Sequence, residues 1–347
     1  MSDTRGAKDP HPTLRDVAQQ AQVSAMTVSR VLRDDPRVLP ATAARVRAAA
    51  AELGYRRNEM ARSLRLGSGT GLVGLVVTNL ANPFYSRLAL GVDAVVAQHG
   101  LKTVIGNTGH DVDSERGLVA DLVARRVDGI IVVPAADDQR HLAAAAAGGV
   151  PVVVASRPPN GFAADCVLVD DYGGARTVTR HLLDAGHRRI GFVGSPPAVY
   201  TAAERLRGFT DALADAGLKP EPDHVRLGPQ ETEEAGRAAA ELLDLRQPPT
   251  ALFCSNNRNT IGAFRAIRGA GTDTALAGFD DFELADVLGL PLTIAAYDSD
   301  ELGREAGRLL VGRLGEGPAD GGSASGPPAR RVVVPTSLVH YGTPGPV

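Results

Sequence analysis

Apolar residues recur with a helical period near the start of the chain. The apolar positions of the first such segment are Leu14, Val17, Ala18 and Ala21. Thr13 precedes this segment, and Asp16 three residues later completes a capping-box pattern. Ser24 stands at the N-cap position of a second short helix, and a third helix opens at Pro40 and stops at Gly54. These patterns predict three packed helices over 13–57.

Short polar segments surround this helical region. The first 12 residues form a polar tail without an apolar stretch. A fourth, short helix is predicted over 58–66, with Asn58 as its cap, and "GSGTG" at 67–71 has the composition of a linker. The chain therefore divides into a small helical part and a larger part that begins at residue 67.

The pattern changes from residue 72 onward. Short apolar runs typical of buried strands alternate with amphipathic stretches typical of helices. The runs are "LVGLVV", "KTVIG", "GIIVV", "VPVVVAS" and "CVLVD", then "RIGFVG", "TALFCS" and "TALAGF". The helical stretches are 83–98, 113–125, 138–147, 172–185, 201–216, 231–243 and 257–269. This alternation occurs twice and predicts two open, parallel α/β layers, followed by a solvated loop at 316–328 and a last strand, "RRVVVP".

Charge is distributed unevenly between the two parts. Residues 1–66 hold 12 Lys and Arg against 7 Asp and Glu, whereas the remainder holds 25 against 33. A basic N-terminal part on an acidic body is typical of a nucleic-acid-binding module joined to another domain. The two cysteines, Cys166 and Cys254, lie in predicted buried strands, so we expect a reducing compartment and no disulfide. We expect no membrane span and a cytoplasmic, nucleoid-associated protein.

The second helix has the composition of a recognition helix. Two short helices joined by a tight turn on a basic module indicate a helix-turn-helix, whose second helix enters the major groove. Its first turn presents Ala25 and Met26, which suit thymine methyl groups, and Arg30 suits guanine O6 and N7. The hydroxyls of Thr13, Thr27 and Ser29 suit phosphate oxygens. Periodicity alone is equally compatible with an ordinary three-helix packing unit.

The residues from 13 to 66 resemble the DNA-binding module of the LacI/GalR family. The resemblance rests on "TLRDVAQQAQVSAMTVSRVL" and "VLPATAARVRAAAAELGYRRNEMARSLRLG", and it continues into the core with "GLVGLVV" and "NPFY". It implies a helix-turn-helix module over 13–57, a hinge helix over 58–66, and a two-lobed core over 67–347 that is similar to periplasmic binding proteins, with parallel sheets. The implied DNA contacts are Thr13, Leu14, Ser24, Ala25, Met26, Thr27, Ser29, Arg30, Thr42, Tyr55, Asn58, Ala61 and Leu64.

The resemblance also implies how the hinge helix acts. Ala61 and Leu64 enter the minor groove, where the leucine of each subunit wedges into a central CG step and kinks the operator. Arg57 stands where the family commonly has proline, and Glu59 places a negative charge near the DNA. We therefore expect a hinge helix that forms only with DNA and a second subunit. Ala25 and Met26 also depart from the commoner family pairs, so the operator half-site cannot be copied from a relative.

For the core, the resemblance implies an effector site between two lobes. The N-lobe covers about 71–170 and 298–329, and the C-lobe covers about 171–297 and 330–347, so the chain crosses near Asp170, Tyr297 and Arg330. The implied ligand contacts are Phe84, Tyr85, Ser156, Arg205, Asn256 and Asp280. Ser156 replaces a common aspartate, and Val199 stands where purine-binding members have arginine. We expect a small-molecule effector, a sugar or sugar derivative, with induction as the default response.

No catalytic or metal-binding pattern accompanies these features. "GTGLVG" at 69–74 precedes a strand instead of following one, so it is not a dinucleotide fingerprint. The histidines lack metal-ligand spacing, and "VGSPP" is no nucleophile elbow. We expect no enzyme, no cofactor and no metal. A sugar- or nucleoside-metabolising enzyme and a solute-binding protein are the alternatives.

A single helix-turn-helix contacts only half of a palindromic site. We therefore expect a homodimer through the core, since operator symmetry mirrors protein symmetry. The helix over 83–98 is the predicted contributor, because its apolar residues cover more than one face. No heptad run occurs near the end of the sequence, so a dimer is expected in preference to a tetramer. The predicted function is a repressor of a catabolic operon, switched by an effector in the core.

Overall fold

The computed structural model describes residues 12–55, 69–315 and 328–342. The chain divides into two compact units, and the boundary falls between Thr70 and Gly71. The predicted hinge helix over 58–66 and the predicted tail, apart from Pro12, lie outside the described residues. Within the described residues no helix is long and apolar enough to cross a membrane.

The first unit contains the three predicted helices. They are α1 (Leu14–Gln20), α2 (Ala25–Val31) and α3 (Pro40–Glu52). The hydroxyl of Thr13 caps α1 in a capping box with Asp16, as the sequence predicts. Each helix contributes fully buried valines to one small core: Val17, Val28 and Val46. Packing of these apolar faces stabilises the short helices, which would be marginal in isolation.

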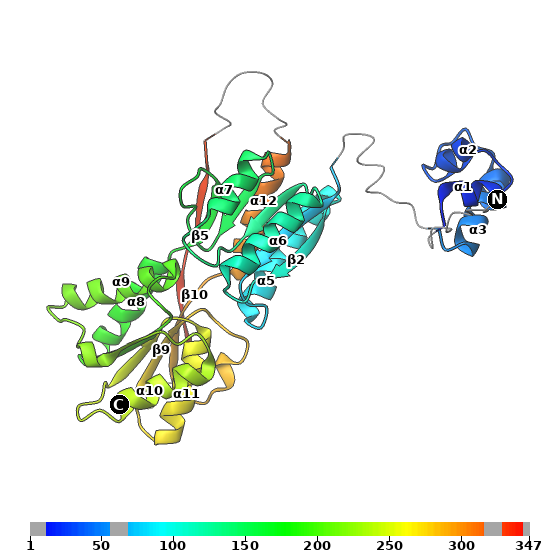
Figure 1. Ribbon diagram of the computed structural model, residues 1–347. Helices are drawn as coiled ribbons and strands as arrows, with labels where there is room; N and C mark the ends of the chain where they lie inside the picture. Colours follow the sequence, from blue (N-terminus) through cyan, green and yellow to red (C-terminus); the bar gives the residue numbers. More distant parts are fainter. Residues whose placement is uncertain (1–11, 56–68, 316–327, 343–347) are drawn as a thin grey trace, which may run out of the picture. The chain divides into compact units, whose positions relative to one another are not determined.

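The N-lobe of the second unit is a six-stranded parallel sheet in the order β11-β5-β4-β3-β1-β2. Its strands are β1 (Leu72–Val77), β2 (Lys102–Asn107), β3 (Gly129–Val132), β4 (Val152–Ala155), β5 (Asp165–Val169) and β11 (Arg331–Val334). Its helices are α5 (Pro83–Val96), extended by η1 (Ala97–His99), α6 (Val112–Ala124), α7 (Arg140–Ala147) and α12 (Ser299–Gly315) (Figure 1). Alternate residues of the strands pack on α5 and α12 or on α6 and α7, because side chains alternate along a strand.

The C-lobe is a second six-stranded sheet in the order β12-β10-β9-β8-β6-β7. Its strands are β6 (Ile190–Gly194), β7 (Val225–Leu227), β8 (Ala251–Cys254), β9 (Ala275–Phe279), β10 (Leu292–Ala296) and β12 (Ser337–Tyr341). Its helices are α8 (Asp171–Asp184), α9 (Tyr200–Asp215), α10 (Thr232–Leu243) and α11 (Asn257–Ala270), with short turns η2 (Pro222–His224) and η3 (Ala285–Val287) (Figure 1). The sheet is parallel except for β12, which pairs antiparallel with β10. The predicted parallel sheets are therefore confirmed, with one antiparallel strand at this edge.

The chain crosses between the lobes at three points. The first two crossings follow β5 and β10, at the predicted positions near Asp170 and Tyr297. The third lies after Val334, not near Arg330, because β11 pairs with β5 of the N-lobe. The assignment of residues 330–334 to the C-lobe is thus wrong, and "RRVVVP" is not the last strand, because β12 follows it. The two free cysteines, Cys166 and Cys254, lie buried in β5 and β8 as predicted.

Candidate functional site

The first turn of α2 presents an exposed surface. Ser24 caps the helix by accepting a hydrogen bond from the backbone N of Thr27 at 3.1 Å. Ala25, Met26 and Arg30 are exposed, and Met26 keeps 64% of its surface. Among the described residues, the guanidinium of Arg30 has no hydrogen bond or ion pair. An exposed thioether and an unengaged guanidinium, held on a capped helix, are available to an external partner.

The hydroxyls predicted to contact phosphate have internal partners as well. The Thr13 hydroxyl donates to Asp16 Oδ2 at 2.7 Å, and Arg33 donates to Ser29 Oγ at 2.8 Å. Thr27 and Ser24 share a hydrogen bond of 2.9 Å between their hydroxyls. Arg33 was not predicted from the sequence, although it lies one helical turn after Ser29 and adds a positive charge to the same surface. These hydroxyls therefore form hydrogen bonds within the helical unit and also present polar groups at its surface.

The other predicted DNA-contacting residues differ in exposure. Leu14 and Tyr55 are half-buried and pack against the small core of the first unit. Thr42 is half-buried in the first turn of α3. Asn58, Ala61 and Leu64 lie outside the described residues. Leu39, at the N-cap of α3, makes no side-chain cap.

The second site is a cavity of about 110 Å³ in the core, lined by residues of both lobes. All six residues predicted to contact a ligand line it: Phe84, Tyr85, Ser156, Arg205, Asn256 and Asp280. Ser156, Asn256 and Asp280 follow the carboxyl ends of strands, whereas Phe84 and Tyr85 lie in the first turn of α5 and Arg205 lies in the second turn of α9. In α/β sheets, ligands bind at this edge because the strand ends and helix starts converge there.

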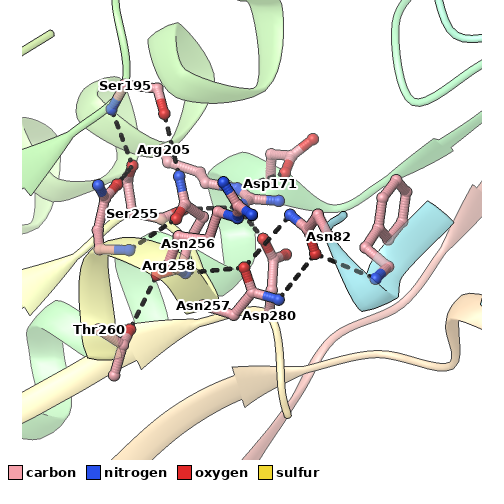
Figure 2. A network of polar contacts seen from close by, with 12 residues as sticks. Asn82, Asp171, Ser195, Arg205, Ser255, Asn256, Asn257, Arg258, Thr260 and Asp280 are labelled. Carbon is pink, nitrogen blue, oxygen red and sulfur yellow. Dashed lines mark hydrogen bonds and ion pairs between the residues drawn. The ribbon is translucent and has the colours of Figure 1, made fainter. Parts of the chain in front are cut away.

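Arg205 is the centre of the polar network in the cavity (Figure 2). Its Nε donates to Asp171 Oδ1 at 2.7 Å, and its Nη1 donates to Asp280 Oδ2 at 2.9 Å and to the carbonyl of Ser255 at 2.5 Å. Its guanidinium carbon lies 3.7 Å from the centre of the Phe279 ring. The side chain is therefore fixed on every side, with its charge compensated by two carboxylates.

Burial controls the ionisation of this network. Burial alone would lower the pKa of Arg205, but Asp280 and Asp171 outweigh it and raise that pKa above its ordinary value. Burial raises the pKa of Asp171 to about 7, although Arg205 acts in the opposite direction. Burial likewise raises the pKa of the Tyr297 hydroxyl, which lines the same cavity. Arg205 thus remains charged between two carboxylates, Asp171 and Asp280.

The polar strand-end residues of the C-lobe are engaged mostly with one another. Asn256 Oδ1 accepts from the backbone N of Asn259 at 2.9 Å and caps α11, while its Nδ2 donates to Ser195 Oγ at 3.0 Å. Ser195 was not predicted, although it directly follows β6. Figure 2 shows these contacts beside Arg205. Asn256 therefore lines the cavity as a cap and positions Ser195.

One pair of amides connects the two lobes. Asn82 Nδ2 donates to Asn257 Oδ1 at 3.4 Å, and Asn257 Nδ2 donates to Asn82 Oδ1 at 3.0 Å (Figure 2). Asn82 also caps α5 by accepting from the backbone N of Phe84 at 3.1 Å. Neither asparagine was predicted, because the contact joins positions 175 residues apart in the sequence.

Two loop residues at the cavity carry polar atoms without a partner. Ser156 Oγ and Asp280 Oδ1 are buried and have no hydrogen bond within the described structure. Both residues adopt the left-handed backbone conformation, with φ of 61° and 65°. Non-glycine residues adopt this conformation rarely, and it clusters at functional sites. Ser156 and Asp280 are therefore positioned for a group that enters the cavity.

Comparison with known families now identifies the architecture. Residues 13–58 match the model of bacterial regulatory proteins of the lacI family, and residues 70–322 match periplasmic binding proteins and the sugar-binding domain of the LacI family. The chain belongs to the LacI family. The matched ranges coincide with the helical unit and the two-lobed core, so this LacI-family chain is a DNA-binding transcriptional regulator.

Individual members of the LacI family agree over nearly the whole chain. The transcriptional repressor CytR of Escherichia coli K12 is 30% identical over 306 residues, which are 87% of this chain and 89% of CytR. The structure of the Lac repressor dimer bound to operator and the anti-inducer ONPF has a TM-score of 0.78 at 28% identity and covers 95% of this chain and 98% of that one. The complex of the regulator CelR with cellobiose has a TM-score of 0.70 at 31% identity, with the same coverage. These relatives are transcriptional regulators, not enzymes.

Proposed function

We propose that this LacI-family regulator is a repressor of a catabolic operon. It binds a palindromic operator as a homodimer and releases it when a small-molecule effector, a sugar or sugar derivative, enters the core cavity. The observation that carries this proposal is the combination of a capped recognition helix with an unengaged Arg30 and a polar cavity between two lobes. A protein needs both features to couple DNA binding to a metabolite.

The DNA contacts of the proposal divide into two kinds. Ala25, Met26 and Arg30 contact base edges in the major groove, and the hydroxyl-bearing residues of α1 and α2 contact phosphates. Arg33 supports this surface by holding Ser29. Ala61 and Leu64 act in the minor groove, where paired leucines open a central CG step. Phosphate contacts fix the register, so the major-groove residues determine which half-site is chosen.

Exposed apolar residues on the core support a homodimer. Leu90 of α5 and Val104 and Ile105 of the edge strand β2 are 62%, 42% and 44% exposed. α5 packs beside β2, so these side chains lie on neighbouring elements of the N-lobe. The C-lobe adds exposed Leu284 and Val287 around η3. Exposed apolar side chains occur at protein interfaces, and a second copy of the chain is the partner that a palindromic operator requires.

The cavity suits a ligand with several hydroxyl groups. Asp280 Oδ1 is free to accept a hydrogen bond, and Ser156 Oγ is free to donate or accept one. Phe84 and Tyr85 supply ring surfaces 4.9 Å apart between their centres, against which an apolar sugar face packs. The solved complex of a relative with cellobiose favours the same ligand class. Induction is proposed as the response: the effector binds the state of low operator affinity more tightly and shifts the protein towards it.

A ligand screen on the full-length chain tests this proposal. Pentoses, hexoses, sugar acids, disaccharides, nucleosides and purines are added, and the melting temperature is recorded. A compound that stabilises the protein is then added to the complex with operator DNA, and fluorescence anisotropy of the DNA is followed. We expect release of the operator. Asp280→Asn weakens the effect of the compound, whereas Asp121→Asn, at an exposed position of α6, leaves it unchanged. DNA binding that responds to no ligand contradicts the proposal.

A further inference from the structure

The cavity between the lobes is small for a ligand site. Its volume is about 110 Å³, whereas pockets that hold small molecules usually measure about 300–1,000 Å³. Side chains of both lobes line it, among them Phe84 and Ser156 of the N-lobe and Arg205 of the C-lobe. The structure therefore shows the lobes closed around the cavity, and they must separate before a molecule of the size of a sugar can enter.

The amide pair of Asn82 and Asn257 lies away from the three chain crossings. The crossings follow β5, β10 and β11, whereas Asn82 follows β1 and Asn257 follows β8. In the N-lobe sheet β4 and β3 lie between β5 and β1, and in the C-lobe sheet β9 lies between β10 and β8. Because the lobes are joined by chain only at the crossings, their separation moves residues apart most at positions distant from the crossings. The amide pair occupies such a position.

Each amide of the pair is fixed to its own lobe. Asn82 Oδ1 accepts from the backbone N of Phe84 and thereby caps α5. Asn257 is 3% exposed, and its Oδ1 accepts from the backbone N of Arg258 at 2.8 Å in the first turn of α11. The two reciprocal hydrogen bonds, of 3.0 and 3.4 Å, join these anchored side chains (Figure 2). Neither side chain can follow the opposite lobe, so separation of the lobes breaks the pair.

The strength of this contact suits a reversible closure. When the lobes separate, water replaces each lost partner, so one hydrogen bond shifts the balance between closed and open lobes by about 2- to 12-fold. The pair also lies at the cavity itself, because Asn82 and Arg258, the neighbour of Asn257, belong to its lining. A contact of this kind favours closed lobes and still allows thermal motion to open them.

We propose that Asn82 and Asn257 form a latch between the lobes, and that opening of this latch controls access to the cavity. The latch holds the ligand-free core closed, and a ligand enters while the two amides are apart. The inference concerns the core by itself. It applies to any molecule that occupies the cavity, and it depends neither on operator binding nor on the direction of the response to an effector.

A thiol placed in the cavity measures lobe opening in the full-length chain. Ser156→Cys introduces it at a position that is 6% exposed and lines the cavity. Thiol–disulfide exchange with the uncharged reagent dithiodipyridine joins one half of the reagent to the cysteine sulfur and releases the other half as thiopyridone, whose absorbance is followed. The reagent reaches the thiol only between separated lobes. Its rate of reaction therefore follows the population of open lobes when closing is faster than the exchange.

Serine replaces each asparagine of the latch in the Ser156→Cys protein. Serine is a good N-cap, so Asn82→Ser keeps the cap of α5, but its side chain is too short to reach the other lobe. We expect Asn82→Ser and Asn257→Ser each to react about 5-fold faster than the Ser156→Cys protein alone. The double variant should react no faster than the single ones, because both changes break the same contact. Gln247→Ser, at an exposed amide before β8, is the control and leaves the rate unchanged.

The natural cysteines report on general loosening of the fold. Cys166 and Cys254 are buried in β5 and β8, so the reagent reaches them only when a sheet opens. Each latch variant is therefore also made without Ser156→Cys, and its cysteines should react as slowly as those of the natural chain. Three results would overturn the inference: unchanged rates in the latch variants, a double variant whose acceleration is the product of the single ones, or equal acceleration of the natural cysteines.

Discussion

At the scale of single residues, Arg205 is the central side chain of the cavity, and contacts within the protein hold it on several sides. Arg205 contacts two carboxylates, a carbonyl and a phenyl ring. Its removal would leave Asp171 and Asp280 as buried, uncompensated carboxyls. A buried charge without its partner costs about 3–5 kcal/mol. The same side chain therefore serves the folding of the C-lobe and the shape of the cavity.

Asp171 makes the stability of the core depend on pH. Its pKa in the folded protein is about 7, against about 3.9 in the unfolded chain. At pH values between these two pKa values, Asp171 keeps its proton in the folded state and has lost it in the unfolded state. The contribution of Asp171 is therefore greatest below about pH 4 and declines as the pH rises towards 7. We expect Asp171→Asn to gain stability relative to the natural chain between pH 5 and pH 7, measured as the midpoint of urea unfolding.

The control for this pH dependence is Asp121→Asn, at an exposed position of α6. Its difference from the natural chain should stay constant between the two pH values. If the difference for Asp171→Asn is equally constant, Asp171 does not titrate in this interval and the assignment of its raised pKa is contradicted.

Arg30 determines sequence preference in the proposed DNA complex. Arg30→Ala should weaken binding to the preferred operator by about 1–3 kcal/mol and relax the choice of base at one position of each half-site. Fluorescence anisotropy with the operator and with single-base variants measures this, and Arg125→Ala is the control. A loss of equal size on every DNA sequence would assign Arg30 to phosphate contact instead.

The residues of the candidate site were predictable to different degrees. Those that follow or precede strand ends, such as Ser156 and Asp280, could be placed from the pattern together with the family resemblance, and they meet at one cavity. Whether a polar side chain has a hydrogen-bond partner depends on segments that are distant in the sequence. The pairing of Asn82 with Asn257 therefore could not be inferred from local sequence.

At the scale of elements, close packing between α5 and α12 determines how the N-lobe is assembled. A Cβ added at Gly91 would lie 2.1 Å from the carbonyl oxygen of Asp300, and one added at Gly303 would lie 2.2 Å from that of Leu88. Because the atoms that an added Cβ would meet belong to the backbone, a change of side-chain rotamer cannot relieve the clash. The glycines are thus required by the approach of the two helices.

Gly91→Ala should therefore destabilise the core by about 1–3 kcal/mol, the usual range for overpacking. Gly117→Ala is the matched control, because an added Cβ at this exposed position of α6 meets nothing within 4 Å. Alanine is the better helix former, so this control should gain about 0.5–1 kcal/mol. Chemical unfolding of both variants measures the two changes, and a neutral Gly91→Ala would contradict the packing described.

Local patterns predicted most elements, and pairing between distant segments explains the rest. The predicted strands β1 to β6, β8 and β9 occur where periodicity indicates, whereas β7 and β10 were not predicted. β11 was assigned to the wrong lobe because its apolar pattern suits either sheet, and only its pairing with β5 decides. β12 is an edge strand without a fully buried residue, and it was missed because only its pairing with β10 shows it. Where the chain crosses between the lobes, the sheet that a strand joins depends on pairing with residues far away in the sequence.

At the scale of the whole molecule, the proposed dimer interface lies on the core. Ile105→Asp places a charge on the exposed edge strand β2 and should shift the protein towards monomers, with a corresponding loss of operator affinity. Val333→Asp is the control, because Val333 is 48% exposed on β11, the opposite edge strand of the same sheet. Sedimentation velocity measures both variants. If Ile105→Asp stays a dimer, the proposed interface is wrong.

The central claim is that this protein recognises a specific operator as a symmetric dimer. Selection from a pool of random duplexes with the full-length chain, followed by sequencing, tests it most directly. The account predicts enrichment of a palindrome with two inverted half-sites around a central CG step, and binding to it that weakens steeply with added salt because phosphate charges are neutralised. Enrichment of no sequence, or of a single asymmetric site, would contradict the claim.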